Sequence, residues 1–302
     1  VNLKSSLASN GGAAGGTNTG PSGSAGHIKI TAVDDIKTVG LQAKVGGGAN
    51  GQGVGGATGS VTLIAGTISG TGVIDTVGGY RGAGGDVTIT STEGDITIDG
   101  AVNTNSGLTG WGGDARRSAG NITIDSAASV MATAVISANG GAANGTQTGS
   151  SGHAGHIKIT AVDDIKTVGL QAKVGQGADG QGIGGTTGFI TLTSGTISGT
   201  GAVDTAGGYR GAGGDVILTS TVGNITLDGA VNSNSGNTGS ATDSRRSAGN
   251  ITIDSAASVI ASAVMSANGG AANGTQTGTS GNAGHIKITA VADIKTVGLQ
   301  AK

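Results

Sequence analysis

Short stretches of the chain alternate apolar and polar residues with a period of two. In residues 87–89, Val87 and Ile89 face one side of an extended strand and Thr88 faces the other. The same pattern recurs at 28–30, 61–63 and 122–124. The alternation predicts β-strands that bury one face, with inward columns formed by Ile28, Ile30, Val61, Leu63, Val87, Ile89, Ile122 and Ile124.

Each of these strands opens a longer segment that begins with glycine. The segments start at Gly26, Gly59, Gly85 and Gly120 and run for 33, 26, 35 and 35 residues. Each supplies a second apolar stretch, at 36–41, 68–73, 96–102 and 130–135. A loop rich in Gly, Asn, Ser, Ala and Thr follows, at 45–58, 77–84, 103–119 and 138–154. We therefore expect four equivalent strand–strand–loop units, with their loops on one side.

A long repeat of 129 residues contains these four units. The string that begins at His27 returns at His156, and again at His285 with Ala292 in place of aspartate. Residues 26–154 align with 155–283 without a gap, and about four-fifths of the positions are identical. The sequence predicts one continuous solenoid over 1–302: partial repeat 1–25, repeats 26–154 and 155–283, and partial repeat 284–302.

Stacking is the way such units can bury their apolar faces. A single unit is too thin, whereas equivalent units stacked in register pair every backbone with the coils above and below. We therefore expect an all-β fold, a parallel and right-handed β-helix with about four coils per repeat. At about 4.8 Å per coil, roughly nine coils would form a rod about 45 Å long.

Composition agrees with this fold and removes several classes of function. The chain has 65 glycines, which disfavour helices, and only one Phe, one Trp and two Tyr. A net charge of −2 gives no basic face for nucleic acid. No apolar run is long enough to span a membrane, and cysteine is absent.

Residues 84–102 carry a family resemblance. The motif Gly-Gly-Asp-Val-Thr-Ile-Thr-Ser-Thr-Glu-Gly-Asp-Ile-Thr-Ile-Asp-Gly-Ala-Val resembles the filamentous haemagglutinin-type repeats of large bacterial adhesins, and related motifs occur at 61–73 and 122–135. The resemblance implies a long exported rod on a bacterial surface that serves in adhesion, a biofilm or a sheath. The secretion domain of that family is not in this sequence, and loops such as 137–155 are longer than those repeats often have.

Paired carboxylates and histidines are the first candidates for chemistry. Asp34-Asp35 recurs as Asp163-Asp164 but becomes Ala292-Asp293, which favours solvated turn charges over acid–base work. His27, His156 and His285 should lie about 19 Å apart, too far to share a metal ion. We expect no catalytic residues, no metal and no cofactor.

A threonine ladder suggests ice binding as an alternative. The central outward position of the first strand reads Thr at five of nine coils, but Lys29, Lys158 and Lys287 interrupt it every fourth coil. Ice binding requires an uninterrupted flat ladder, so the lysines count against it.

Aromatic residues beside arginines are the candidate contact residues. Tyr80-Arg81 and Tyr209-Arg210 occupy equivalent loop positions, and Trp111 lies in the next loop. Such groups stack on sugars or on another rod, or they anchor their own loop.

The sequence as a whole predicts a structural protein rather than an enzyme. We expect an extracellular β-solenoid on the bacterial cell surface, the shaft of an adhesin or the subunit of a fibre or sheath. Its expected partners are further copies, end to end or side by side, and cell-surface or matrix carbohydrate. The alternative is a carbohydrate-binding or carbohydrate-cleaving β-helix.

Overall fold

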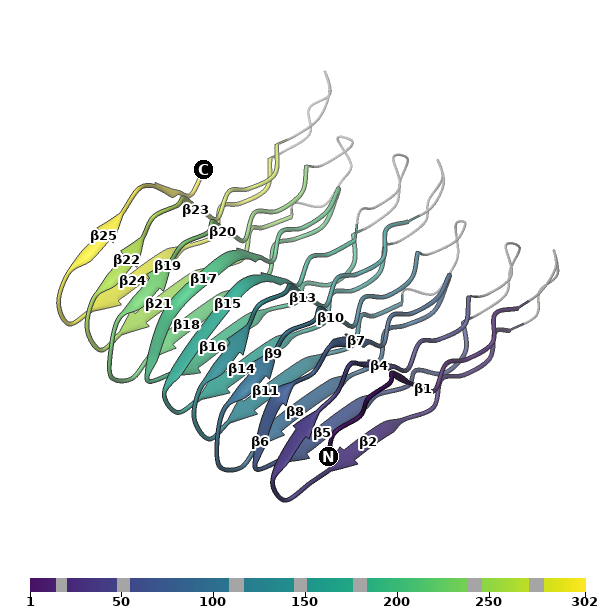
Figure 1. Cartoon of the computed structure of the whole chain (residues 1–302). Helices are drawn as coiled ribbons and strands as arrows, with labels where there is room; N and C mark the ends of the chain where they lie inside the picture. Colours follow the sequence, from purple (N-terminus) through teal and green to yellow (C-terminus); the bar gives the residue numbers. More distant parts are fainter. Residues whose placement is uncertain are drawn as a thin grey trace.

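The described part of the chain is a stack of parallel β-strands (Figure 1). A computed structural model describes residues 1–14, 21–47, 55–108, 117–143, 151–175, 184–237, 246–271 and 280–302. These ranges contain no helix, and every strand pairing in them is parallel. The predicted all-β solenoid is confirmed.

The first sheet contains one strand from each of nine successive coils, in chain order. Each of the seven inner strands pairs with the strands of the coils before and after it, and the two end strands pair with one neighbour. The nine strands are β2 (Ile28–Thr31), β5 (Val61–Ala65), β8 (Val87–Ser91), β11 (Ile122–Ser126), β14 (Ile157–Ala161), β16 (Ile190–Ser194), β18 (Val216–Ser220), β21 (Ile251–Ser255) and β24 (Ile286–Ala290).

The second sheet contains the apolar stretch that follows in each coil, divided into two short strands in most coils. The strands are β1 (Leu7–Ala8), β3 (Asp35–Lys37), β4 (Gly40–Gln42), β6 (Thr67–Gly70), β7 (Val73–Asp75), β9 (Ile96–Ile98), β10 (Val102–Asn103), β12 (Val130–Ala132), β13 (Ile136–Ser137), β15 (Asp164–Gln171), β17 (Thr196–Asp204), β19 (Ile225–Leu227), β20 (Val231–Asn232), β22 (Val259–Ala261), β23 (Met265–Ser266), β25 (Ile294–Thr296) and β26 (Leu299–Gln300). A tight turn joins the two sheets at one edge of the stack (Figure 1).

The core lies between the sheets and consists of columns of aliphatic side chains. In the first sheet, Val87 is level with Ile122, and Ile89 with Ile124, as the alternation predicted. All four are buried, together with the corresponding residues of the other inner coils. Ile30 is only partly buried, because it lies in the first complete coil and has less of the core on one side.

The core side chains show why aromatic bulk is not needed. The largest fully buried side chains are Ile and Leu, for example Ile36, Leu63 and Ile98. Two sheets that pack face to face leave room for one such side chain from each. Pairs that differ between the repeats, such as Ile89 and Leu218, exchange one aliphatic residue for another.

A column of glycines closes each coil where the two sheets meet the loops. The amide N–H of Gly120 donates to the carbonyl oxygen of Thr104 at 2.8 Å, across the coil. Corresponding bonds join Gly85 to Thr76 and Gly155 to Ala138, both at 2.9 Å. We call this column the neck glycines; it comprises Gly26, Gly59, Gly85, Gly120, Gly155, Gly188, Gly214, Gly249 and Gly284.

The neck glycines bring backbones of neighbouring coils very close together. A Cβ added to Gly120 would overlap with the carbonyl oxygen of Gly85, and a Cβ on Gly155 would overlap with that of Gly120. The same holds from Gly59 to Gly284. Glycine is therefore required here for the approach of one backbone to the next.

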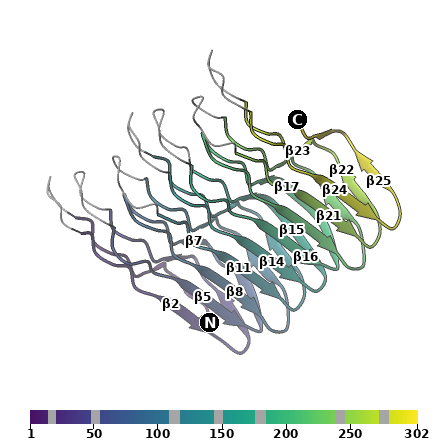
Figure 2. The same ribbon diagram turned by 180° about the vertical axis from the view of Figure 1, so that it is seen from behind.

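Beyond the neck, the coils continue into the glycine-rich loops. The described residues on either side of these loops extend from the same side of the stack in both views (Figures 1 and 2). The loops were predicted to project from one side, and this is confirmed for those of their residues that the structure describes.

Substitution of an inward residue should unfold the solenoid far more readily than substitution of its outward neighbour. Ile89→Asp places an unpaired carboxylate in the core and should cost on the order of 4 kcal/mol or more. Thr88→Asp leaves the carboxylate on the outer face and should cost under about 0.5 kcal/mol. Thermal melting checks this, and equal shifts for the two variants would contradict the inward and outward assignment.

A methyl group at the neck should also be costly. Gly120→Ala forces a Cβ onto the backbone of the coil below and should destabilise the fold by about 1–3 kcal/mol. Gly47→Ala is the matched control, since its nearest neighbours would be Tyr80 backbone N and Cβ, at 3.6 and 3.8 Å. Denaturant unfolding should separate the two, and a Gly120→Ala protein as stable as the control would show that the neck is not closely packed.

Candidate functional site

The expected contact residues Tyr80 and Arg81 form the tip of a tight turn. The N–H of Gly82 donates to the carbonyl oxygen of Gly79 at 2.6 Å. Arg81 has a φ of 59°, a left-handed conformation that is uncommon for residues other than glycine. The second copy repeats this turn, with Arg210 at the same φ and a Gly211-to-Gly208 bond of 2.7 Å. We call residues 79–82 and 208–211 the Tyr–Arg turns.

The Tyr–Arg turns lie between the loops of the two neighbouring coils. The N–H of Arg81 donates to the carbonyl oxygen of Leu108, and its own carbonyl oxygen accepts from Gly55. Arg81 is only 8% exposed, while Tyr80 is half-buried. This geometry is that of an ordered loop anchor that leaves part of the tyrosine open to contact. The remaining expected contact residue, Trp111, lies outside the described residues.

The Asp35 carboxylate connects one coil to the next. It accepts hydrogen bonds from Thr67 Oγ1 at 3.0 Å, from the Ser69 N–H at 3.0 Å and from Ser69 Oγ at 2.7 Å. Slight burial acts to raise the pKa of Asp35, but these bonds outweigh it and the pKa lies below its ordinary value. Asp164 makes the corresponding bonds to Ser198. Both carboxylates are therefore engaged in holding the turn between the sheets.

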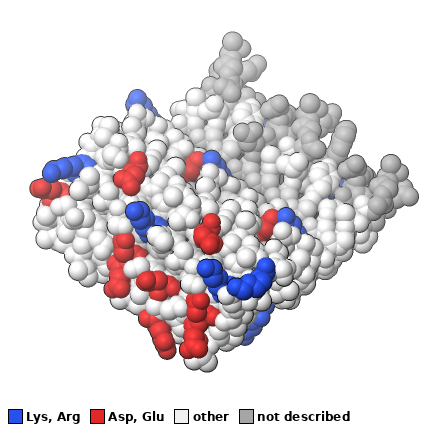
Figure 3. All heavy atoms as spheres, viewed as in Figure 1, with Lys and Arg blue, Asp and Glu red and all other residues white. Residues whose placement is uncertain are grey.

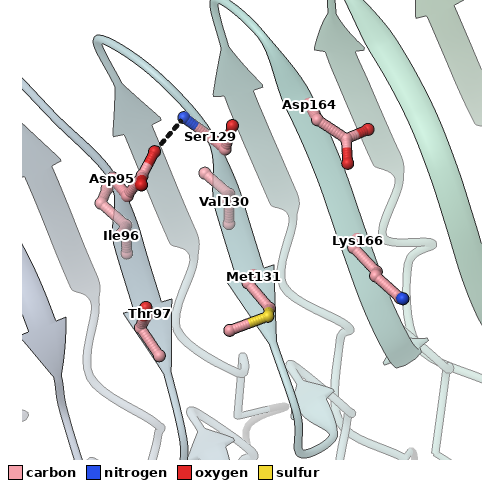
Figure 4. A pocket seen from close by; sticks show the side chains of 8 residues that line it. All are labelled: Asp95, Ile96, Thr97, Ser129, Val130, Met131, Asp164 and Lys166. Carbon is pink, nitrogen blue, oxygen red and sulfur yellow. Dashed lines mark hydrogen bonds between the residues drawn. The ribbon is translucent and has the colours of Figure 1, made fainter.

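Other Asp and Asn side chains make the same kind of connection. Asn121 Oδ1 accepts from the N–H of His156, one coil further on, at 2.9 Å. Asp95 Oδ1 accepts from the N–H of Ser129, also at 2.9 Å (Figure 4). These bonds recur in the second copy, where Asn250 Oδ1 accepts from the His285 N–H and Asn224 Oδ1 accepts from the Ser258 N–H. The sequence analysis assigned Asp34-Asp35 to solvated turn charges and gave Asp95 and Asn121 no role, since these bonds depend on the exact register of neighbouring coils.

The histidines do not gather around a common point. His27 Nδ1 lies 2.8 Å from Ser60 Oγ, whereas the ring of His156 stacks on Phe189 with centroids 3.7 Å apart. Burial lowers the pKa of His156 below its ordinary value. Within the described ranges, no group of three or more His, Cys, Asp or Glu residues is placed to hold a metal ion.

Two shallow depressions mark the outer surface of the described part. One, of about 210 Å³, lies across β9, β12 and β15 (Figure 4). Its lining comprises Asp95, Ile96, Thr97, Ser129, Val130, Met131, Asp164 and Lys166. The other, of about 200 Å³, lies at the turn between the sheets near Val162 and Val222. The first depression places the hydroxyl residue Ser129 beside Asp95, whose carboxylate accepts from the Ser129 N–H, so this carboxylate is engaged in joining two coils.

The threonine ladder has the register that the sequence predicted. Thr88 is level with Thr62 and Thr123, and Thr123 is level with Lys158. Lys29, Lys158 and Lys287 are exposed on this face, as is Ile217. The face is therefore threonine-rich but interrupted.

No helix in the described ranges is long and apolar enough to cross a membrane.

The comparisons with known proteins add no family. No family model matches the chain, and neither the curated proteins nor the solved structures contain a match.

Acid should weaken the fold through Asp35. The pKa of Asp35 is lower in the folded state than in the unfolded state, where it is near 4. The hydrogen bonds of the ionised carboxylate therefore add to the free energy of unfolding fully above the unfolded-state pKa, and this stabilisation is lost as the pH falls through the folded-state pKa. Asp35→Asn should therefore reduce the fall in stability between about pH 5 and pH 2. Asp34→Asn, beside it and exposed, serves as the control. Melting midpoints that fall equally for both variants would contradict the role given to Asp35.

Proposed function

We propose that this chain is a structural shaft, a length of stiff extracellular β-solenoid from a bacterial surface adhesin, fibre or sheath. The observation that supports the proposal best is that polar side chains form hydrogen bonds between neighbouring coils. Carboxylates and amides that could serve chemistry, such as Asp35, Asp95 and Asn121, connect successive coils instead.

This arrangement of bonds suits a shaft that must resist mechanical force. Successive coils are joined by two parallel sheets, and side-chain bonds add to them at the turn, as at Asp95, and at the edge of the first sheet, as at Asn121. Bonds of this kind repeat along the whole described stack, so no single coil is a weak point. A shaft needs uniform strength along its length, and the repeated residues supply it.

Self-association in a fibre and contact with surface carbohydrate are the interactions that we propose for the shaft. The half-buried Tyr80 and Tyr209 are held in fixed turns and are suited to stacking on a sugar ring. A carbohydrate-binding or carbohydrate-cleaving β-helix is the alternative, and these two tyrosines are the observation that favours its binding form. Ice binding is a weaker alternative, because lysines interrupt the threonine face.

Surface labelling and a sugar-release assay test the proposal together. Antibodies to the chain should label intact source cells, and the purified chain should release no sugar from bacterial or host polysaccharides. Labelling only after permeabilisation would contradict the surface location. Sugar release would favour the enzyme and overturn the shaft.

Glycan binding can be separated from the shaft role with paired variants. If the Tyr–Arg turns bind sugar, Tyr80→Ala with Tyr209→Ala should abolish retention on a glycan array and leave the melting temperature nearly unchanged. Thr88→Asp, on the outer face of the first sheet, is the control that should keep retention. Retention unaffected by the tyrosine substitutions would remove these turns as a sugar site.

A further inference from the structure

Two half-buried histidines lie on either side of the neck glycine Gly155, and both bond to the next coil. His153 Nδ1 accepts from the Thr186 N–H at 2.6 Å and lies 2.7 Å from Thr186 Oγ1. His156 Nδ1 accepts from the Phe189 N–H at 3.2 Å. Both imidazoles therefore contribute to one contact between neighbouring coils. We call residues 153–156 together with residues 186–189 the histidine joint.

These bonds fix the protonation state of both rings. A ring nitrogen that accepts a hydrogen bond carries no proton, so each neutral imidazole has its proton on Nε2. An imidazolium carries a proton on both nitrogens and accepts no hydrogen bond. Protonation would therefore leave each Nδ1–H facing a backbone N–H, a donor against a donor. Imidazole takes up this proton in mild acid, since its ordinary pKa is near 6.5.

The surroundings of His156 favour the neutral ring. Burial against the neighbouring coil lowers its pKa below the ordinary value. Lys158 lies two residues further along the same strand, while Asp86 and Asp215 lie two coils away on either side, about 10 Å distant. The stacked ring of Phe189 could attract a cation, but this attraction gives the Phe189 N–H no new acceptor.

The charged residues around His153 do not offer an anion among the described residues packed there. The His153 N–H donates to the carbonyl oxygen of Arg117 at 3.1 Å. On the second sheet, Asp204 is already paired with Lys173 at 2.7 Å. Many of the acidic side chains in Figure 3 gather toward the turn between the sheets, at the other end of the coil from the neck.

We propose that the histidine joint is a pH-sensitive contact, which holds two coils together at neutral pH and opens more readily in mild acid.

The first long repeat makes the same contact without this dependence on pH. Ser24 stands where the second copy has His153, and Ser24 Oγ accepts from the Ala57 N–H at 3.0 Å. A serine hydroxyl does not titrate in this range. His27 corresponds to His156, but its Nδ1 lies 2.8 Å from Ser60 Oγ. A hydroxyl can accept as well as donate, so this bond survives protonation of His27.

The direction of the pH effect follows from His156. Its pKa is lower in the folded state than in the unfolded state, where it is near 6.5. The stabilisation from its neutral ring is therefore complete above the unfolded-state pKa and is lost as the pH falls through the folded-state pKa. The loss from Asp35 lies mainly below about pH 5, so the two effects fall in different ranges.

Hydrogen exchange on the full chain tests the joint, with rates corrected for the intrinsic effect of pH. Between about pH 7.5 and pH 5, the protection of the Thr186 and Phe189 amides should fall about ten-fold or more. The Ala57 amide, which is bonded to Ser24, is the internal control and should keep its protection. Protection that falls equally at all three amides, or at none, would overturn the proposal.

Paired variants separate the imidazoles from the rest of the fold. His153→Ser with His156→Asn replaces both rings with acceptors that the chain already uses, the hydroxyl of Ser24 and the amide of Asn121. This variant should fold and keep the protection of its joint at about pH 5. His27→Asn is the matched control and should leave the response to pH unchanged. A double variant that still loses protection, or a control that abolishes the response, would contradict the assignment.

Nitrogen NMR of the two rings gives a second readout. Long-range proton–nitrogen spectra should show Nδ1 unprotonated in His153 and His156 at about pH 7.5 and protonated at lower pH. A protonated Nδ1 in either ring at neutral pH would overturn the proposal. At neutral pH the joint is bonded like the other coils, so a joint that ignores pH would leave the proposed shaft standing.

Discussion

The close approach of backbones at the neck glycines is the constraint on which the rest of the structure depends. The glycine of each coil lies against the carbonyl oxygen of the glycine before it, with no room for a Cβ. The N–H of most of these glycines donates across the coil, as from Gly120 to Thr104. In the coils that have a hydroxyl at this point, such as Thr104, the side chain adds a bond to the same glycine. This closure separates two packed sheets from the loops and fixes where every coil begins.

Because every coil begins at the same neck position, equivalent residues of successive coils stack into columns along the rod. Aliphatic columns then fill the core without aromatic residues, and Asp or Asn columns bond to backbone N–H groups one coil away. The same regularity spreads polar residues evenly along the rod instead of collecting them at one level. A stiff shaft with repeated contact surfaces follows from this arrangement more readily than a catalytic cleft does.

The columns could be predicted from the sequence, because alternation such as Val87-Thr88-Ile89 repeats with glycines at regular intervals. The level pairing of Thr88 with Thr123 followed from the same alignment and is confirmed. The glycine that opens each segment stood out in the sequence, but its role at the neck could not be predicted, because only the coordinates show how closely two backbones approach there. The bonds of Asp35 depend on the turn geometry, so only the coordinates show that this carboxylate joins two coils.

Hydrogen exchange at the neck tests the central claim most directly. If the glycine column closes each coil, the amides of Gly85, Gly120, Gly155, Gly214 and Gly249 should exchange as slowly as strand amides such as those of Ile89 and Ile124. That result would place the boundary of the cooperative fold at the glycines. Neck amides that exchange at the rate of unprotected amides, while the strand amides stay protected, would contradict the account.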